Sequence, residues 1–182
     1  AEHGIEHQII DTQIFELAGE KIRKNSSFCS FFSRMRRGYI YSTAQEQGYN
    51  KVALGHHLDD AMESFFMNFF YNGTMRTMPP IYKAENGLEV IRPLIFCRER
   101  QLRAFADSKE IRVMGDEACP GLRFDVKMPH ARAATKELLA KLEEQNPKIF
   151  VSMKAAFSNI QLPTFFYKNL KDIKLNIEDE NI

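Results

Sequence analysis

The sequence has few cysteines, no apolar run of membrane-spanning length and almost no net charge. Its three cysteines, Cys29, Cys97 and Cys119, do not have the number or spacing of a disulfide framework. No apolar run approaches the about 20 residues that cross a bilayer, and the polar start Ala1–Gly4 is unlike a signal peptide. The formal net charge of +1 favours no class of partner, so local charge has to be considered. We therefore expect a cytoplasmic protein that does not bind membranes.

Segments with strand character alternate with segments of helical period, which predicts an α/β domain with a mainly parallel, doubly wound sheet. The predicted strands are residues 5–11, 51–55, 88–91 and 111–114. The predicted helices are residues 30–47, 59–71, 98–108, 131–145 and 148–159. On the first of these, Phe32, Met35, Tyr39 and Thr43 fall on one stripe, and Gly48 is its expected stop. Helix 59–71 is apolar nearly all round and is expected to be buried. In helix 98–108 we expect Leu102, Phe105 and Ala106 to face inward.

The segment Gly55-His56-His57-Leu58-Asp59-Asp60 carries the clearest chemical signal. It follows a short apolar strand, so it stands where doubly wound sheets bind their ligands. Its two carboxylates can hold Mg²⁺ on a nucleotide or accept hydrogen bonds from it, and the start of a helix adds a positive field. The alternative is that Asp59 or Asp60 only caps the helix, which is the commoner use of such residues.

Several motifs in chain order resemble one family. Gly55–Asp60 matches the second signature of the PP-loop ATP-pyrophosphatases. Residues 29–38, Cys-Ser-Phe-Phe-Ser-Arg-Met-Arg-Arg-Gly, are similar to the family's Cys-Ser-x-Cys-Ser-Arg-x-Arg-Arg-Gly. Residues 69–73 with 78–80, and residues 91–94 with 97–99, resemble its Phe-Tyr-Gly-Gly…Met-Pro-Pro and Ile-Arg-Pro-Leu…Cys-Arg-Glu. The resemblance is strongest to the branch of tRNA 2-thiocytidine synthetases.

The resemblance implies an enzyme that adenylates a tRNA base with ATP and then, in this branch, replaces the activated oxygen with sulfur. The positions that match the family's ATP and Mg²⁺ site are Gly55, His56, Asp59 and Asp60, with Asp60 also expected to be catalytic. Arg37 and Arg92, with Arg36, are candidate contacts to phosphate or the tRNA backbone, because guanidinium groups suit phosphate oxygens. A solvated helix face is the alternative for these arginines.

The resemblance also implies an iron–sulfur cluster held by three cysteines. Cys29 and Cys119 match the first and third ligands, but Phe32 stands where the second belongs. Three interpretations stay open: a cluster completed by a non-cysteine group, a redox or persulfide-carrying pair formed by Cys29 and Cys119 without a cluster, or vestigial cysteines. The count of ligands favours a protein without a cluster. Cys97 matches a family cysteine that is not a ligand.

The family's phosphate loop, Ser-Gly-Gly-x-Asp-Ser, does not occur in the 182 residues. Its glycines let backbone N–H groups surround pyrophosphate. We therefore expect the chain to be a fragment that lacks its first strand–helix units, with a partial PP-loop domain at residues 1–128 and a C-terminal helical extension and tail at 129–182. The expected partners are tRNA, a sulfur donor such as a cysteine desulfurase and a second copy of the chain. The rival interpretations are a relative with other base chemistry and an inactive protein that binds a nucleotide or tRNA.

Overall fold

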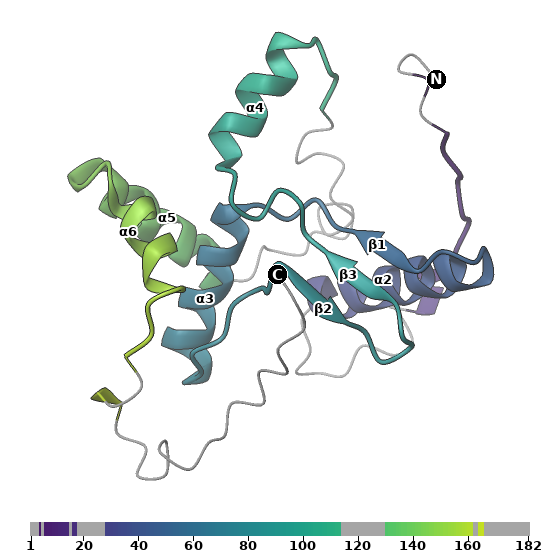
Figure 1. Cartoon of the computed structure of the whole chain (residues 1–182), viewed down its shortest axis with the longest axis horizontal. Helices are drawn as coiled ribbons and strands as arrows, with labels where there is room; N and C mark the ends of the chain where they lie inside the picture. The colour runs from purple at the N-terminus through teal and green to yellow at the C-terminus, as the bar shows by residue number, and fades with distance from the viewer. Residues whose placement is uncertain are drawn as a thin grey trace. The chain divides into compact units, whose positions relative to one another are not determined.

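The structure, a computed structural model, describes residues 4, 6–14, 16–17, 28–113, 130–161 and 164–165, with only the backbone of residues 28, 29 and 130. Two compact units divide after Lys141. The elements are α2 (Phe28–Glu46), β1 (Lys51–Ala53), α3 (Leu58–Asn72), β2 (Ile81–Lys83), β3 (Glu89–Ile91), α4 (Glu99–Ser108), α5 (His130–Gln145) and α6 (Ile149–Ala156) (Figure 1). The predicted alternation of helices and strands is therefore confirmed from residue 28 to residue 108. The predicted domain boundary after residue 128 lies outside the described residues.

Helix α2 lies where the sequence predicts it and turns its apolar stripe inward. The partly buried residues of that stripe are Phe32, Met35, Tyr39 and Thr43. Arg36, on another side of the helix, is exposed, and α2 packs against β1 (Figure 1). The chain leaves the helix at Gly48, whose φ of 76° lies in the left-handed region that glycine adopts without a Cβ clash. The predicted helix stop at Gly48 is thus confirmed.

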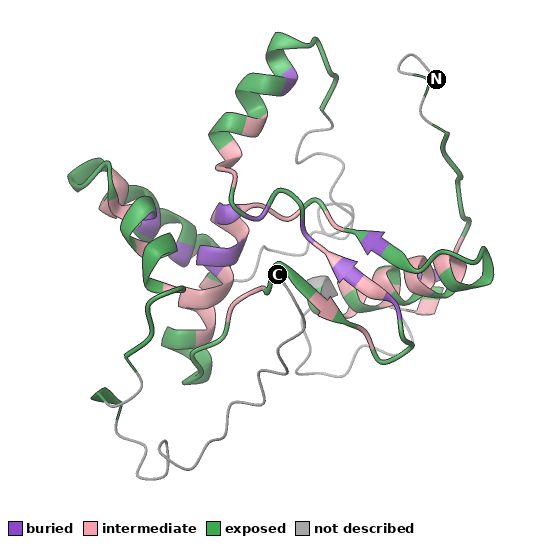
Figure 2. Ribbon diagram, in the orientation of Figure 1, coloured by how far each residue is buried: buried purple, intermediate pink, exposed green. Residues whose placement is uncertain are grey.

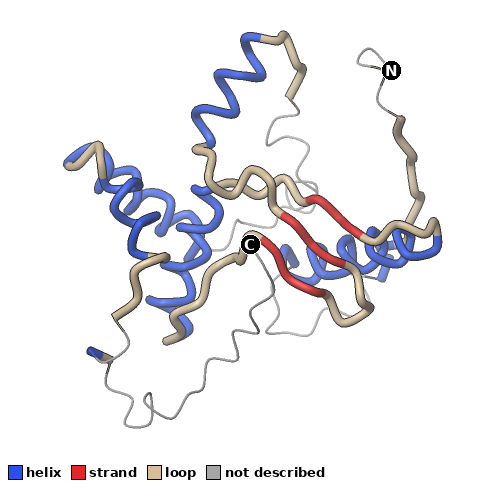
Figure 3. Tube along the Cα trace, viewed as in Figure 1, coloured by secondary structure: helices blue, strands red, loops and turns tan. Residues whose placement is uncertain are grey.

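Three short strands form one sheet in the order β1-β3-β2 (Figure 3). β1 and β3 run parallel with Val52 opposite Val90, and β2 runs antiparallel to β3 with Tyr82 opposite Val90. Val52 and Val90 are buried, so the sheet presents apolar side chains to the core. The parallel pair was predicted, whereas β2 was not. Its three residues follow Pro79 and Pro80, a pair that indicates a loop and conceals so short a strand.

Helix α3 begins and ends at recognisable capping residues, His57 and Gly73. Gly73 has a φ of 61° and its amide donates to the carbonyl of Asn68, an ending that glycine allows. The buried residues all lie in the first half of the helix: Leu58, Ala61, Met62 and Glu63. In the second half, Phe69 and Phe70 are 46% and 51% exposed and stack on the rings one helical turn before them (Figure 2). The prediction that the helix is buried throughout was therefore wrong for this half, where aromatic rings cover one another.

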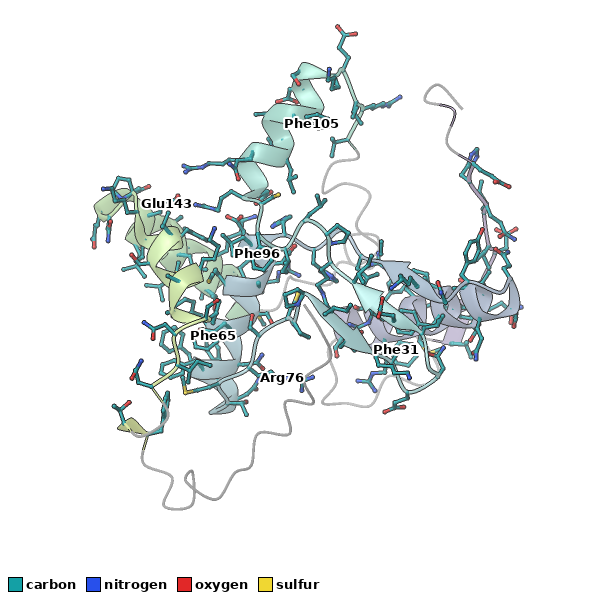
Figure 4. The ribbon with its side chains drawn as sticks, viewed as in Figure 1. Phe31, Phe65, Arg76, Phe96, Phe105 and Glu143 are labelled. Atoms are coloured by element: carbon teal, nitrogen blue, oxygen red, sulfur yellow. The ribbon has the colours of Figure 1, made fainter. Side chains whose placement is uncertain are left out.

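Three further sequence predictions were wrong. In α4, Ala106 is buried as expected, but Phe105, labelled in Figure 4, is 58% exposed. The described part of segment 5–11 and residues 111–113 are not paired as strands. Apolar residues alone suggested those strands, and no neighbouring strand in the described sheet pairs with them.

In the second unit, Phe150 of α6 is buried.

Candidate functional site

The candidate site lies where the two parallel strands end. Because β1 and β3 run side by side, the residues that follow them come out at the same edge of the sheet. The amide of Leu54 still donates to the carbonyl of Ile91 at 2.9 Å. Beyond that bond, His56 follows β1 and Arg92 follows β3, and Arg92 Nε donates to His56 Nδ1 at 3.3 Å. The strands thus bring together two residues that the sequence separates by 36 positions.

Arg92 is held inside the protein, with 6% of its surface exposed. Its Nη1 donates to the carbonyl of Pro79 at 2.6 Å, and its guanidinium lies 5.2 Å from the centre of the Tyr82 ring. A cation over an aromatic face is attracted by the ring's negative charge distribution. Arg92 was predicted to contact phosphate or tRNA; in the structure its Nε, its Nη1 and the planar face of its guanidinium contact His56, Pro79 and Tyr82.

An aromatic pair extends this cluster toward α2. The hydroxyls of Tyr41 and Tyr82 are 2.9 Å apart. Burial raises the pKa of Tyr41 to about 12, and the hydrogen bond to Tyr82 acts in the same direction, while the cations of Arg37 and Arg92 oppose both. Burial also lowers the pKa of His56, and the Arg92 cation adds to that effect. His56 is therefore favoured in its neutral form next to two cationic side chains.

The start of α3 is closed by a reciprocal pair of hydrogen bonds. The amide of His57 donates to Asp60 Oδ2 at 3.1 Å, and the amide of Asp60 donates to His57 Nδ1 at 3.4 Å. This is a capping box in which a histidine takes the usual place of serine or threonine. Asp60 therefore caps the helix, and its other oxygen stays available for a second contact.

Asp59 joins α3 to the start of α4. Arg98 reaches its carboxylate through Nε at 3.1 and 3.2 Å and through Nη2 at 3.0 Å, and the amide of Glu99 donates to Oδ2 at 2.8 Å. Burial alone would raise the pKa of Asp59, but the hydrogen bonds from Arg98 and Glu99 outweigh it and hold that pKa below its ordinary value. Asp59 is thus an ionised carboxylate that holds two helices together.

Asp60 and Glu63 share one guanidinium from α5. Arg132 Nη2 lies 3.2 Å from Asp60 Oδ1, and Arg132 Nε lies 3.1 Å from Glu63 Oε2. Glu63 is buried, and burial raises its pKa despite the nearby Arg132 cation. Arg132 is half exposed, so it is the part of this triad that solvent or a ligand can approach.

Gly55 has open space where a side chain would begin. A Cβ added there would meet no atom of the described residues within 4 Å. Since Gly55 is also exposed, the backbone between β1 and the start of α3 faces an unfilled region. Arg37 reaches the same neighbourhood from α2, because its charge acts on both His56 and Tyr41.

The predicted cysteine site cannot be drawn from the described side chains. Cys29 lies in the first turn of α2, where only the backbone is described, and Cys119 lies outside the described residues. Phe32 stands one turn after Cys29 and is partly buried. Cys97 is a free thiol. Within the described ranges, no three His, Cys, Asp or Glu side chains are grouped closely enough to hold a metal ion.

The sequence predicted Gly55, His56, Asp59, Asp60, Arg37 and Arg92, and all of them lie at or beside the carboxyl ends of β1 and β3. It missed four partners: Tyr82, Arg98, Glu63 and Arg132. Tyr82 was missed together with strand β2. Arg98 and Arg132 gave no local signal, because they lie 39 and 72 positions beyond the carboxylates with which they pair. Among the helices that the structure describes, none is long and apolar enough to cross a bilayer.

An α/β sheet with polar groups gathered beyond the ends of its parallel strands defines a nucleotide-binding class of domain. The sequence comparison agrees, because residues 10–127 match the PP-loop domain family. The chain belongs to that family, as its motifs indicated. The match includes every site residue described above except Arg132.

The chain is also similar to curated proteins named tRNA-cytidine(32) 2-sulfurtransferase. It is 40% identical to the one from Geobacter metallireducens over 162 residues, 88% of this chain. It is 37% identical to the one from Pseudomonas syringae over 172 residues, 94% of this chain. In both cases the chain spans 61% of the relative's length. The resemblance to the cytidine-thiolating branch is thus supported by relatives of that name.

A solved structure has the same fold. The U34-tRNA thiolase NcsA from Methanococcus maripaludis, with its [4Fe-4S] cluster, superposes with a TM-score of 0.66. The comparison covers 100% of this chain and 59% of the thiolase at 20% sequence identity. The predicted PP-loop type of α/β fold is therefore confirmed.

Proposed function

We propose that this chain forms part of an ATP-dependent tRNA-modifying enzyme that transfers sulfur to a cytidine through an adenylated base. The observation that carries the proposal is the meeting of His56, Arg92 and the start of α3 beyond two parallel strands. The PP-loop family and the names of the curated relatives point to the same chemistry. ATP adenylates the cytidine oxygen and pyrophosphate leaves; sulfur then replaces that oxygen, which leaves with AMP.

In this proposal Gly55, His56, Asp59 and Asp60 line the ATP site. The open space at Gly55 gives the nucleotide room, and the N-terminus of α3 attracts phosphate. Both carboxylates accept hydrogen bonds, but the cation on Asp60 is the half-exposed Arg132, whereas Asp59 is held by the nearly buried Arg98 and by the amide of Glu99, so we assign Mg²⁺ to Asp60. Mg²⁺ suits such oxygen donors and would offset the charge of the phosphates. Arg37, the other arginine whose charge acts on His56, is the one that we assign to phosphate.

The thiolating chemistry is assigned to Cys29 and Cys119. The residues of this chain do not fit the three-cysteine cluster that the family resemblance implies, since Phe32 stands at the place of the second ligand and its ring has no atom that binds iron. We therefore propose that these two thiols carry sulfur without a cluster. Phe32 is also the observation that favours a second candidate, a PP-loop relative with other base chemistry.

We further propose that the protein works in the cytoplasm on tRNA, as a pair of copies, with a cysteine desulfurase as sulfur donor.

The test is nucleoside analysis of tRNA from a strain in which the gene that encodes this chain is deleted. We expect 2-thiocytidine to disappear and to return when the full gene product is supplied. Unchanged 2-thiocytidine in the deletion strain would remove sulfur transfer to cytidine as the function.

Variants of the same gene test the cysteine assignment. Cys29→Ser and Cys119→Ser should each fail to restore 2-thiocytidine, whereas the matched control Cys97→Ser should restore it. Normal 2-thiocytidine with either of the first two variants would show that sulfur does not pass through that thiol. The visible spectrum of the anaerobically purified gene product gives an independent reading, since thiolate-to-iron bands would contradict a cluster-free protein.

A further inference from the structure

Arg92 and His56 make a contact whose direction is fixed by chemistry. A guanidinium has N–H donors and no acceptor, so the bond of 3.3 Å between Arg92 Nε and His56 Nδ1 requires a lone pair on Nδ1. A neutral imidazole with a lone pair on Nδ1 carries its proton on Nε2. Among the described residues, Arg92 is the hydrogen-bond partner of the His56 ring, so the Nε2–H group remains for another molecule.

We infer that Arg92 is a positioning residue, which fixes His56 as the neutral tautomer with its proton on Nε2 and so lets Nε2–H donate to an anionic oxygen of the nucleotide. The clause about the nucleotide rests on the proposed function, whereas the clause about the tautomer does not. The role assigned to Arg92 thus changes from contact with phosphate to control of the residue that contacts it.

The geometry around Arg92 explains why an arginine stands there. Its Nε faces His56, its Nη1 faces the carbonyl of Pro79, and its planar face lies over Tyr82. Tyr82 is in turn bonded to Tyr41 of α2. Each of the three contacts fixes a different direction of the guanidinium, so the group cannot rotate away from His56. A lysine has a single ammonium centre and cannot meet all three partners at once.

The charges around His56 agree with a neutral ring. Arg92 after β3 and Arg37 from α2 are cations that disfavour a second positive charge, and neighbouring His57 acts in the same sense. Asp60 of α3 is the group that favours protonation. Burial is the largest influence, and with the two arginines it lowers the pKa of His56 despite Asp60. His56 therefore offers a hydrogen bond and no charge.

Nitrogen NMR of the chain with ¹⁵N-labelled histidine tests the tautomer directly. We expect His56 at neutral pH to show a protonated Nε2 and a bare Nδ1. In Arg92→Met that preference should weaken and the pKa of His56 should rise, whereas Arg92→Lys keeps the charge and should weaken the preference with a smaller change in that pKa. Arg103→Lys, a matched change at an exposed arginine of α4, should alter neither. A protonated Nδ1 in the unaltered chain would overturn the inference, and this result does not depend on whether any variant folds.

ATP titration of the full gene product tests the contact with the nucleotide. His56→Gln keeps an N–H donor near the place of Nε2, whereas His56→Asn keeps its amide near the place of Nδ1. We expect His56→Asn to weaken ATP binding about tenfold and His56→Gln to weaken it by no more than about threefold. Equal affinities for both variants and the unaltered protein would overturn the contact with the nucleotide. No ATP binding by the unaltered protein would instead refute the proposed function and leave the NMR result standing.

Discussion

Removing the charge of Asp59 should weaken the junction between α3 and α4. Asp59 accepts three N–H groups, two from Arg98 and one from Glu99, and the paired side chains are only 15% and 12% exposed. Breaking one side of a buried pair costs about 3–5 kcal/mol, and a hydrogen bond to a charged group contributes about 1.5–3 kcal/mol. Because Asn in place of Asp59 keeps one acceptor and the site is not fully dry, we expect Asp59→Asn to cost about 2–3 kcal/mol.

Urea unfolding is the appropriate assay. With a slope of about 2 kcal/mol per molar urea, the midpoint of Asp59→Asn should fall by about 1 M. The double variant Asp59→Asn with Arg98→Met should recover part of the cost, because it removes the Arg98 cation together with the carboxylate that pairs with it. Glu137→Gln removes an exposed carboxylate of α5 that pairs with Lys141 and should leave the midpoint unchanged.

The pH dependence gives the same prediction a second check. The pKa of Asp59 is lower in the folded protein than in the unfolded chain, so its contribution is present above the unfolded value and is lost as the pH falls through the folded value. Asp59→Asn should therefore flatten the acid side of the stability profile. A midpoint within about 0.2 M of the unaltered protein, with an unchanged acid profile, would refute the assignment of Asp59 as the joint between the helices.

Three further predictions use the same unfolding assay. Glu63→Gln should keep or raise stability at neutral pH, because burial raises the pKa of Glu63 and makes its charged form costly above that pKa. A loss of stability of over about 1 kcal/mol would show that the ion pair with Arg132 outweighs the cost of burial. Tyr41→Phe should cost about 1 kcal/mol through the lost bond to Tyr82. It should also remove a tyrosine ionisation that we expect at a pKa of about 12, because burial raises that pKa; the stability that Tyr41 adds is lost as the pH rises toward that value. Gly73→Ala should lower stability by about 1 kcal/mol, because Gly73 ends α3 in the left-handed region. Gly38→Ala lies inside α2, where a Cβ meets nothing within 4 Å, and should raise stability by about 0.5–1 kcal/mol. Equal changes in stability for the two variants would contradict the backbone argument.

Local patterns predicted much of the fold because their causes are local. The helix stop at Gly48 depends on one residue's backbone, and the apolar stripe of α2 follows from helical period alone. β1 and the start of α3 were likewise predictable from an apolar run followed by glycine and two carboxylates. The roles within the site were not predictable in the same way. Arg92 looked like a surface cation in the sequence, and only the pairing of β3 with β2 brings it over Tyr82.

The exposed second half of α3 shows a different limit. Phe65, Phe66, Phe69 and Phe70 give the composition of a buried helix, but composition does not say which neighbour covers them. In the structure their rings pack in pairs along the helix itself. The same limit applies to Phe105 on α4, whose position in the helical period was compatible with the core.

The shared guanidinium of Arg132 ties the start of α3 to a segment far along the chain. Asp59 meets its arginine 39 positions later and Asp60 meets Arg132 72 positions later, so both contacts close long loops of the chain. The family match ends at residue 127, before the second joint exists. A protein cut at that point would bury Glu63 without Arg132, the cation that pairs with it. The family match therefore ends before the residue whose cation pairs with both Asp60 and Glu63.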